Sequence, residues 1–166
     1  MRTKPYTQQE LSQMALENIS KRRARVIRYR QRHDSDDDYK STKTDSWDPE
    51  RVVVACGSLL PPFKAARGRQ NSALRNGHPK LKEAYEIKGL QIGHPVPRQI
   101  KTKTDQPYWE PGHCAEPHAA HKLLNIMDRC NPIEIHDIVF GYAFSVLNGT
   151  PIPYCNTCKL VFPQIL

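Results

Sequence analysis

The sequence predicts an α/β protein, organised as a three-layer α/β/α sandwich with a mixed sheet. Apolar residues recur at helical spacing over residues 7–31 and 115–129. Two other stretches, residues 52–56 and 138–146, are short runs rich in β-branched or aromatic residues, which is typical of buried strands. With 166 residues and 38% hydrophobic content, the chain suits one compact domain that does not need disulfides to fold.

The first predicted element is a helix over residues 7–31. Thr7 caps it, and Glu10 lies three residues later, as in a capping box. Its second half is very basic, which leaves two interpretations open: an arm that contacts nucleic-acid phosphates, with Tyr29 stacking on a base, or a solvated helix surface. The candidate phosphate contacts are its arginines, namely Arg22, Arg23, Arg25, Arg28 and Arg30.

A polar segment with an acidic cluster at residues 34–38 follows this helix and predicts a linker. We therefore divide the chain into a basic helix with an acidic polar linker over residues 1–50 and a second domain over residues 51–166. Within the second part, residues 51–60 contain the β-branched run expected to form a buried strand, which Pro61 and Pro62 end.

The middle of the chain has weaker patterns. Residues 64–76 are weakly helical, whereas residues 78–87 predict a better helix with Leu81, Ala84 and Tyr85 on one side. Strands with turns are expected within residues 89–106, around positions 90–92 and 98–102.

The C-terminal part is more regular. The helix over residues 115–129 has an apolar face formed by Ala119, Ala120, Leu123, Leu124 and Met127. Residues 138–146 predict a central strand, and Asn148-Gly149 with two prolines predicts the turn after it. Cys155 then begins a final short helix.

Composition narrows the classes of partner and compartment. The 25 Lys and Arg against 17 Asp and Glu give a net charge of +8, which favours a polyanionic partner, nucleic acid first. The cysteines are odd in number and two stand in a CxxC, which indicates metal ligation or redox chemistry rather than a secreted disulfide framework. No apolar run approaches the roughly 20 residues that span a bilayer, and residues 1–10 lack the apolar core of a signal peptide. We therefore expect that the protein has no membrane partner. If it is exported, we expect the export signal to lie outside this chain.

The chemistry is concentrated in the run Gly-His-Cys-Ala-Glu-Pro at residues 112–117 and in a CxxC about forty residues later. Cys155 and Cys158 are three apart at a helix start, so both sulfurs project to one side of the first turn. Cys114 starts another helix, and thiolates are favoured at helix N-termini. Glu116 is expected to point into the same pocket. Three thiolates with a neighbouring carboxylate predict a catalytic Zn²⁺ site that leaves one position for water.

These residues resemble the cytidine deaminase-like superfamily, whose signature is [His/Cys]-x-Glu followed by Pro-Cys-x-x-Cys. Residues 111–117 and 155–159, with residues 77–81 upstream, are most similar to the YwqJ-like branch of bacterial polymorphic-toxin deaminases. The resemblance implies that zinc is bound by the three cysteines and that Glu116 carries the proton. It also implies secretion as part of a larger toxin, action in a target-cell cytoplasm, and an immunity protein as partner. Tyr154 departs from the signature, because it separates the proline from Cys155.

Other roles stay open at this level. A structural alternative uses Cys155 and Cys158 with His113, His118 or His121 to close a four-ligand zinc site that has no open position. Candidate substrate contacts precede or flank Cys114: Tyr108 and Trp109, which either stack on the target base or anchor the core, together with His113 and Ala115. Lys159 is a candidate to compensate the negative charge of the thiolates, while Cys56 and Cys130 are expected to be buried apolar positions.

The predicted reaction is attack of an activated water on C4 of cytosine in DNA or RNA, with Glu116 protonating N3 and then the departing ammonia. Adenine, attacked at C6, is the second choice. Two alternatives come from other classes: a deaminase of free nucleosides or nucleotides, and a non-catalytic zinc module that binds nucleic acid or protein.

Overall fold

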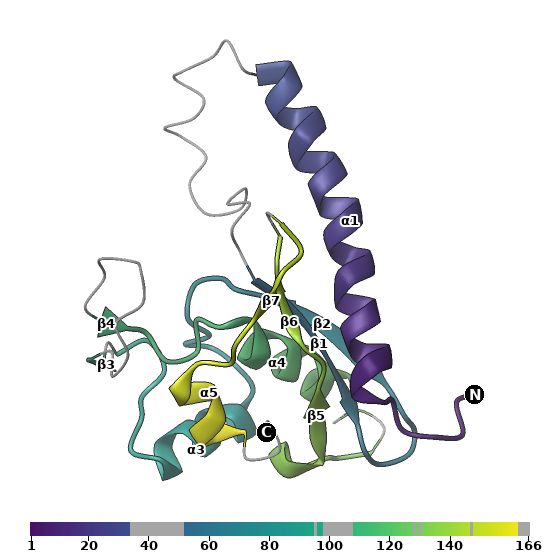
Figure 1. Cartoon of the computed structure of the whole chain (residues 1–166). Coiled ribbons are helices and arrows are strands. Elements are labelled where there is room, and N and C mark those ends of the chain that lie inside the picture. The colour runs from purple at the N-terminus through teal and green to yellow at the C-terminus, as the bar shows by residue number, and fades with distance from the viewer. Residues whose placement is uncertain are drawn as a thin grey trace.

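The computed structural model describes residues 1–33, 52–94, 96–97, 108–127, 129, 131–146 and 148–162. Figure 1 shows the order and arrangement of its helices and strands. The helices are α1 (Gln8–His33), α3 (Pro79–Ile87), α4 (Ala115–Met127), α5 (Asn156–Val161) and the 3₁₀ turn η2 (Ile135–Asp137). The strands are β1 (Val52–Ser58), β2 (Ala65–Arg69), β3 (Val96–Pro97), β4 (Tyr108–Trp109), β5 (Ile138–Phe140), β6 (Ala143–Ser145) and β7 (Pro151–Ile152).

One sheet organises the molecule, with strand order β2-β1-β6-β7 and with β5 also paired to β1. A separate two-stranded sheet joins β3 to β4. Every strand pair in the described part of the chain is antiparallel, so the sheet predicted as mixed contains no parallel pair there.

The strand predicted over residues 138–146 is interrupted in its middle. In β5, Phe140 pairs with Cys56, whereas in β6 Phe144 pairs with Val53, so one extra residue lies between the two paired segments. The amide of Tyr142, which leaves the ladder there, donates instead to the hydroxyl of Ser12 on α1 (2.8 Å). The interruption therefore joins the sheet to the N-terminal helix.

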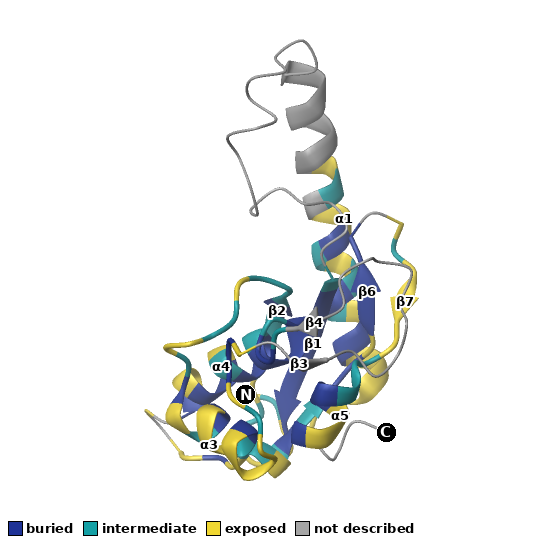
Figure 2. Ribbon diagram, turned by 90° about the vertical axis from the view of Figure 1, so that its left-hand side faces the viewer, coloured by how far each residue is buried: buried dark blue, intermediate teal, exposed yellow. Residues whose placement is uncertain are grey.

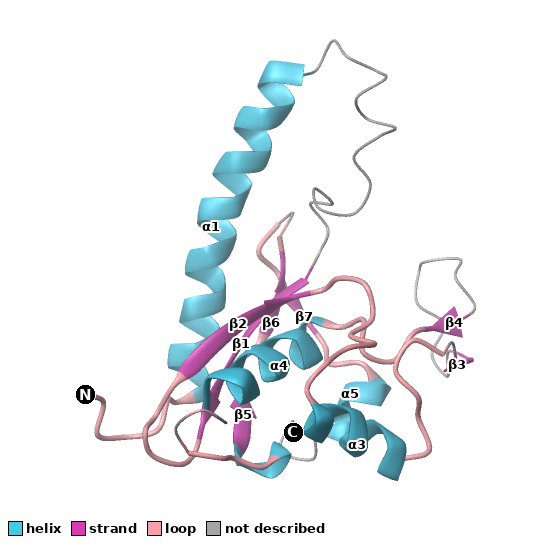
Figure 3. Ribbon diagram, turned by 180° about the vertical axis from the view of Figure 1, so that it is seen from behind, coloured by secondary structure: helices cyan, strands magenta, loops and turns pink. Residues whose placement is uncertain are grey.

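Helices cover both faces of the sheet, and side chains of β1 alternate between them (Figures 1 and 3). Val53 and Ala55 pack with α1, where the buried residues are Leu11, Ala15 and Ile19. Val54 and Cys56 face the opposite layer, which holds α3, α4 and α5. Figure 2 shows β1 buried between these layers. The predicted helix–sheet–helix arrangement is therefore present, and α1 shares a core with the sheet although the sequence grouped it with the linker.

Two glycines allow the helices to lie directly on the sheet. A Cβ at Gly68 on β2 would lie 2.2 Å from the amide nitrogen of Ala119 and 2.3 Å from the carbonyl oxygen of Ala115, both on α4. A Cβ at Gly141 would lie 2.5 Å from the amide nitrogen of Ser12 on α1. Because carbon atoms normally stay about 3.5 Å from such neighbours, any side chain at either position would push a helix away.

The structure confirms the helices predicted over residues 7–31, 78–87 and 115–129 and the short helix after Cys155. The helix expected within residues 64–76 is wrong, because residues 65–69 form β2, an edge strand with alternating burial. The small residues of this segment allow α4 to pack closely on the strand, and they are not a sign of a helix. The strand expected at residues 90–92 is also wrong, since these residues lie in a loop that leads into a turn at residues 92–93. Positions 98–102 and the boundary near residue 50 lie outside the described residues.

Candidate metal centre

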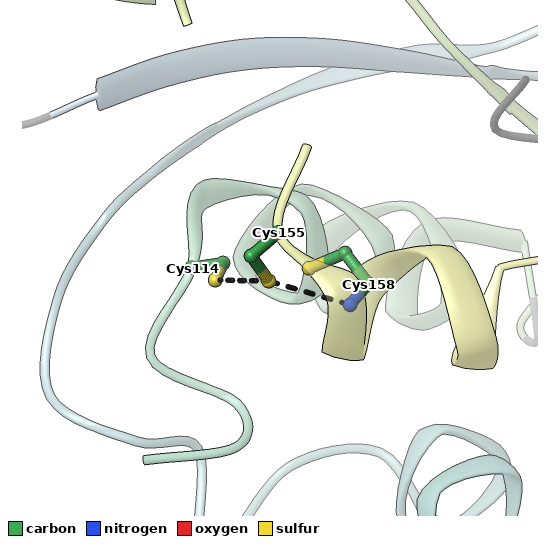
Figure 4. A group of neighbouring side chains, drawn as sticks. All are labelled: Cys114, Cys155 and Cys158. Atoms are coloured by element: carbon green, nitrogen blue, oxygen red, sulfur yellow. Dashed lines mark hydrogen bonds between the residues drawn. The ribbon is translucent and has the colours of Figure 1, made fainter. Parts of the chain in front are cut away.

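Three cysteines from two helix starts come together on one face of the sheet (Figure 4). Cys114 directly precedes α4, Cys155 is the N-cap of α5, and Cys158 lies in the first turn of α5. The Sγ atoms of Cys114 and Cys155 are 3.2 Å apart, and all three sulfurs lie within 4.8 Å of one another. This cluster could hold a metal ion.

The loop before α4 places Cys114. Gly112 adopts a positive φ of 84°, and a Cβ there would lie 2.7 Å from a methyl carbon of Ile92, so this turn requires glycine. The amide of Gly93 donates to the carbonyl of Pro111 (3.0 Å), and the amide of Asn71 donates to the carbonyl of His113 (3.2 Å). Two neighbouring loops therefore hold the residues that lead into Cys114.

The start of α5 places the other two sulfurs. Cys155 has an extended backbone, and its Sγ accepts from the amide of Cys158 at 3.3 Å, which caps the helix. The preceding Tyr154 donates its hydroxyl to the carbonyl of Gly141, in the interruption between β5 and β6. The residue that departs from the superfamily signature thus tethers the CxxC to the sheet.

The donor set fits zinc. Sulfur ligands lie about 2.3 Å from Zn²⁺, which in a tetrahedral site separates them by about 3.8 Å. The separations here, between 3.2 Å and 4.8 Å, bracket that value. The three residues are free cysteines, and each is buried or partly buried. Soft thiolates select zinc over magnesium or calcium, and three protein ligands are the usual number at a catalytic zinc.

Without a metal, the three thiol groups share their protons unequally. Hydrogen bonds from Cys114 and Cys158 lower the pKa of Cys155 to about 3, so Cys155 carries the negative charge. The same hydrogen bond to Cys155 raises the pKa of Cys114, and hydrogen bonds with both other cysteines raise the pKa of Cys158. One ligand is therefore already deprotonated, and metal binding must release the protons of the other two.

Glu116 lies beside the sulfurs but outside the group that could hold the metal. Its side chain is 3% exposed, and its Oε2 accepts from the thiol of Cys158 at 3.7 Å. Burial, followed by the charge of Cys155, raises the pKa of Glu116 to about 7. A carboxyl group with this pKa can both hold and release a proton near neutrality.

No histidine joins the cluster among the described residues, so the predicted four-ligand alternative is not formed by them. His121 is engaged elsewhere, since its Nδ1 accepts from the amide of His78 (3.0 Å). His118 is partly buried, and burial lowers its pKa to about 4, which keeps the ring neutral. His113 is half-buried next to Cys114, and its carbonyl accepts from Asn71.

The remaining candidates are only partly placed. Tyr108 and Trp109 form β4, but their side chains lie outside the described residues. Ala115 is buried, and its carbonyl faces Gly68 of β2. Lys159 is exposed on α5.

Of the five candidate arginines, Arg23 alone has a described side chain, and its Nε donates to the carbonyl of Val146 (3.5 Å). That contact fastens α1 to the loop after β6. The side chains of Arg22, Arg25, Arg28 and Arg30 lie outside the described residues. Cys56 is buried on β1, as predicted, and Cys130 lies outside the described residues.

Sequence reasoning missed one residue near the cluster. Tyr85 was assigned to the apolar side of a helix, which is correct, but its hydroxyl is buried and has no hydrogen-bond partner in the described part of the chain. It belongs to the same core as Cys114 and Cys158. The sequence offered one signal for this buried hydroxyl, namely a tyrosine on a helix face that is otherwise apolar.

No protein-family model, curated protein or solved structure matches the chain. Among the described helices, none has the length and apolar character required to cross a membrane.

Proposed function

We propose that this protein is a zinc-dependent hydrolytic deaminase of a nucleobase, with cytosine in DNA or RNA as the preferred substrate. The observation that carries the proposal is the position of Glu116. It is a buried carboxylate 3.7 Å from one sulfur of a three-cysteine cluster, yet it is not a member of that cluster. A purely structural zinc site uses four ligands and needs no such acid.

Each part of the site has a role in the proposed reaction. Cys114, Cys155 and Cys158 hold the metal, which lowers the pKa of water toward 7 when bound. Glu116 accepts the proton from the attacking water at a carboxylate oxygen and delivers it to N3 of the base. The carboxylate then takes the second proton from the new hydroxyl group on C4 and passes it to the amine nitrogen as the bond from C4 to that nitrogen breaks. Water and cytosine thus become uracil and ammonia, and Glu116 returns to its starting state.

The net charge of +8 supports a nucleic-acid substrate rather than a free nucleoside. A deaminase of free nucleosides needs no positive surface, so its rate would change little with salt. The toxin role and the immunity-protein partner follow from the resemblance alone and stay predictions.

The test uses purified protein incubated with single- and double-stranded DNA and RNA, followed by sequencing for C-to-U and A-to-I changes. Glu116→Ala should abolish turnover while zinc content and folding persist. Glu86→Ala supplies a control, because Glu86 is exposed on α3. Wild-type protein that binds zinc but deaminates no base, free or polymeric, would contradict the enzyme proposal and favour the non-catalytic zinc module.

A salt series separates the two enzyme classes. Activity on an oligonucleotide should fall steeply between about 50 and 200 mM salt, because phosphate contacts weaken as counterions compete. A rate on free cytidine that exceeds the oligonucleotide rate and ignores salt would assign the protein to the nucleoside class instead.

A further inference from the structure

An open hollow lies at one edge of the sheet, separate from the metal centre. β2 is the terminal strand in the order β2-β1-β6-β7, with α1 packed on one face of the sheet and α4 on the other (Figure 3). Between these two helices, along β2, the surface is hollowed by about 570 Å³. Its lining contains neither Glu116 nor any of the three cysteines. We call this hollow the edge groove, and its principal lining residues are Met14, Asn18, Arg67, Lys122, Asn125 and Ile126.

The edge groove carries two cations, and no carboxylate of the described residues lines it. Nε of Arg67 donates to the carbonyl of Met14 on α1 (2.8 Å), which holds the guanidinium group against that helix. Nζ of Lys122, from α4, donates to the carbonyl of Arg67 (2.9 Å), so both cations meet at one residue of β2. Glu17 approaches Nη2 of Arg67 to 3.8 Å, and because these side chains are 56% and 40% exposed, the pair neutralises little. The groove therefore keeps a positive charge that attracts an anion.

The positive charge continues along β2. Arg67 stands opposite Ala55 of β1, and Arg69 stands opposite Val53. Directly opposite residues of an antiparallel pair point to the same face, so both arginines lie on the side of the strand that α1 covers. They are about 6.6 Å apart along the strand, which is close to the distance between successive phosphates of an extended nucleic-acid strand. A row of cations at this spacing suits a polymer with a charge on every unit better than it suits a single small anion.

The rest of the lining suits the uncharged parts of a nucleotide. Met14 on α1 and the exposed Ile126 on α4 supply apolar contacts on either side of the cations. Asn18 and Asn125 supply amide groups, which both donate and accept hydrogen bonds. A nucleotide joins a phosphate to a polar sugar and a base with an apolar face, whereas an acidic side chain of a peptide offers the anion alone. The combined lining therefore favours a nucleotide over an acidic peptide.

We propose that the edge groove binds one nucleotide of a nucleic-acid strand, with Lys122 and Arg67 contacting its phosphate. The inference rests on the nucleic-acid substrate of the proposed function, but not on the chemistry of the metal centre. Lys122 lies eight residues after Cys114, which corresponds to about 12 Å along α4. A strand held in the groove therefore needs few further nucleotides to reach the metal centre.

Lys122→Gln tests the phosphate contact, because glutamine keeps an amide that can donate to the carbonyl of Arg67 but carries no charge. Fluorescence anisotropy measures the binding of short labelled oligothymidylate and oligouridylate strands to the full chain, between about 50 and 200 mM salt. Neither strand has an exocyclic amine, so no deamination changes the probe. Loss of one phosphate contact should flatten the slope of log affinity against log salt by about 0.7, and should weaken binding about fivefold at about 0.1 M salt.

Matched variants separate a local contact from a change in net charge. Lys122→Arg keeps the charge and should keep the wild-type slope, whereas Lys82→Gln removes the same charge from an exposed position on α3 and should change the slope far less. Ile126→Glu places a carboxylate in the groove and should weaken binding at least as much as Lys122→Gln. Ile87→Glu adds the same charge at an exposed position on α3 and should have little effect. Thermal unfolding shows that each variant is folded.

The inference is overturned if Lys122→Gln binds like Lys82→Gln and Ile126→Glu binds like Ile87→Glu. It is also overturned if Lys122→Gln binds more weakly with an unchanged salt slope, which is the result expected of a residue that only supports the fold. Polyglutamate that displaces the labelled strand as well as an unlabelled strand of equal charge does would assign the groove to acidic peptides and overturn the inference.

The wild type distinguishes failure of this inference from failure of the proposed function. Wild-type protein that binds the strands but deaminates no base contradicts the proposed function and leaves the inference standing. Wild-type protein that deaminates free cytidine but binds neither strand overturns the inference and leaves a deaminase of free nucleosides.

Discussion

Replacement of Glu116 by glutamine should change how the stability of the metal-free protein depends on pH. The carboxyl group is 3% exposed, and its pKa is raised from 4.5 to about 7, chiefly by burial. The folded state therefore keeps this proton in a pH range where the unfolded chain has released it. Between about pH 4.5 and 7, the contribution of Glu116 to the free energy of unfolding therefore falls as pH rises, because at this group the folded state binds more protons.

The size of the effect follows from the two pKa values. Each unit of pKa difference is worth about 1.4 kcal/mol, so the ionised Glu116 costs the folded state roughly 3 kcal/mol above pH 7. Glutamine has nearly the same shape and does not ionise. Glu116→Gln should therefore match the wild type near pH 4.5 and become more stable than it by up to roughly 3 kcal/mol at about pH 8.

Urea unfolding with chelator present, repeated from about pH 4.5 to 8, measures this difference. Other groups titrate equally in both proteins, so their effects cancel in the difference. The exposed Glu86, replaced by glutamine, gives the control. A difference between Glu116→Gln and wild type that stays constant with pH, or a wild type that is the more stable protein at pH 8, would refute the reasoning.

Two further predictions concern the position and the reactivity of the sulfurs. Gly68→Ala should destabilise the fold by about 1–3 kcal/mol and weaken zinc binding, because the added Cβ would push away the helix that follows Cys114. Calorimetry measures the change in stability, and competition with a chelator measures the change in zinc affinity. Gly89→Ala is the control, since it has a positive φ of 70° but no neighbour within 4 Å, and it should affect stability alone. In chelated protein, iodoacetamide should modify Cys155 first, because it is the most exposed cysteine of the cluster and its pKa is lowered to about 3. Peptide mass spectrometry that finds Cys158 modified first, or no protection by zinc, would contradict this.

The local patterns of the sequence predicted the cysteine cluster because they depend on short-range geometry. The CxxC places two sulfurs on one helix turn, and Cys114 and Glu116 lie at the start of another helix. Only the contact between these two helices had to be assumed. The structure confirms that the three sulfurs lie together. Their use in catalysis stays a prediction.

Features that depend on tertiary contacts were not predictable in the same way. The small residues of β2 read as a weak helix, because nothing local shows that Gly68 must accommodate α4. The break between β5 and β6 is caused by an extra residue whose amide bonds to Ser12, far away in the chain. Tyr85 counted as an apolar helix residue, and only the three-dimensional structure shows that its hydroxyl lacks a partner.

The packing of α1 has a practical consequence for the design of a shorter version of this protein that still folds. Leu11, Ala15 and Ile19 cover Val53, Ala55 and Phe144 on one face of the sheet. A fragment that started at residue 51 would leave Val53, Ala55 and Phe144 facing solvent, which invites self-association. A shortened version must therefore keep the N-terminal helix at least as far as Ile19. This requirement does not depend on whether the acidic segment after the helix is kept.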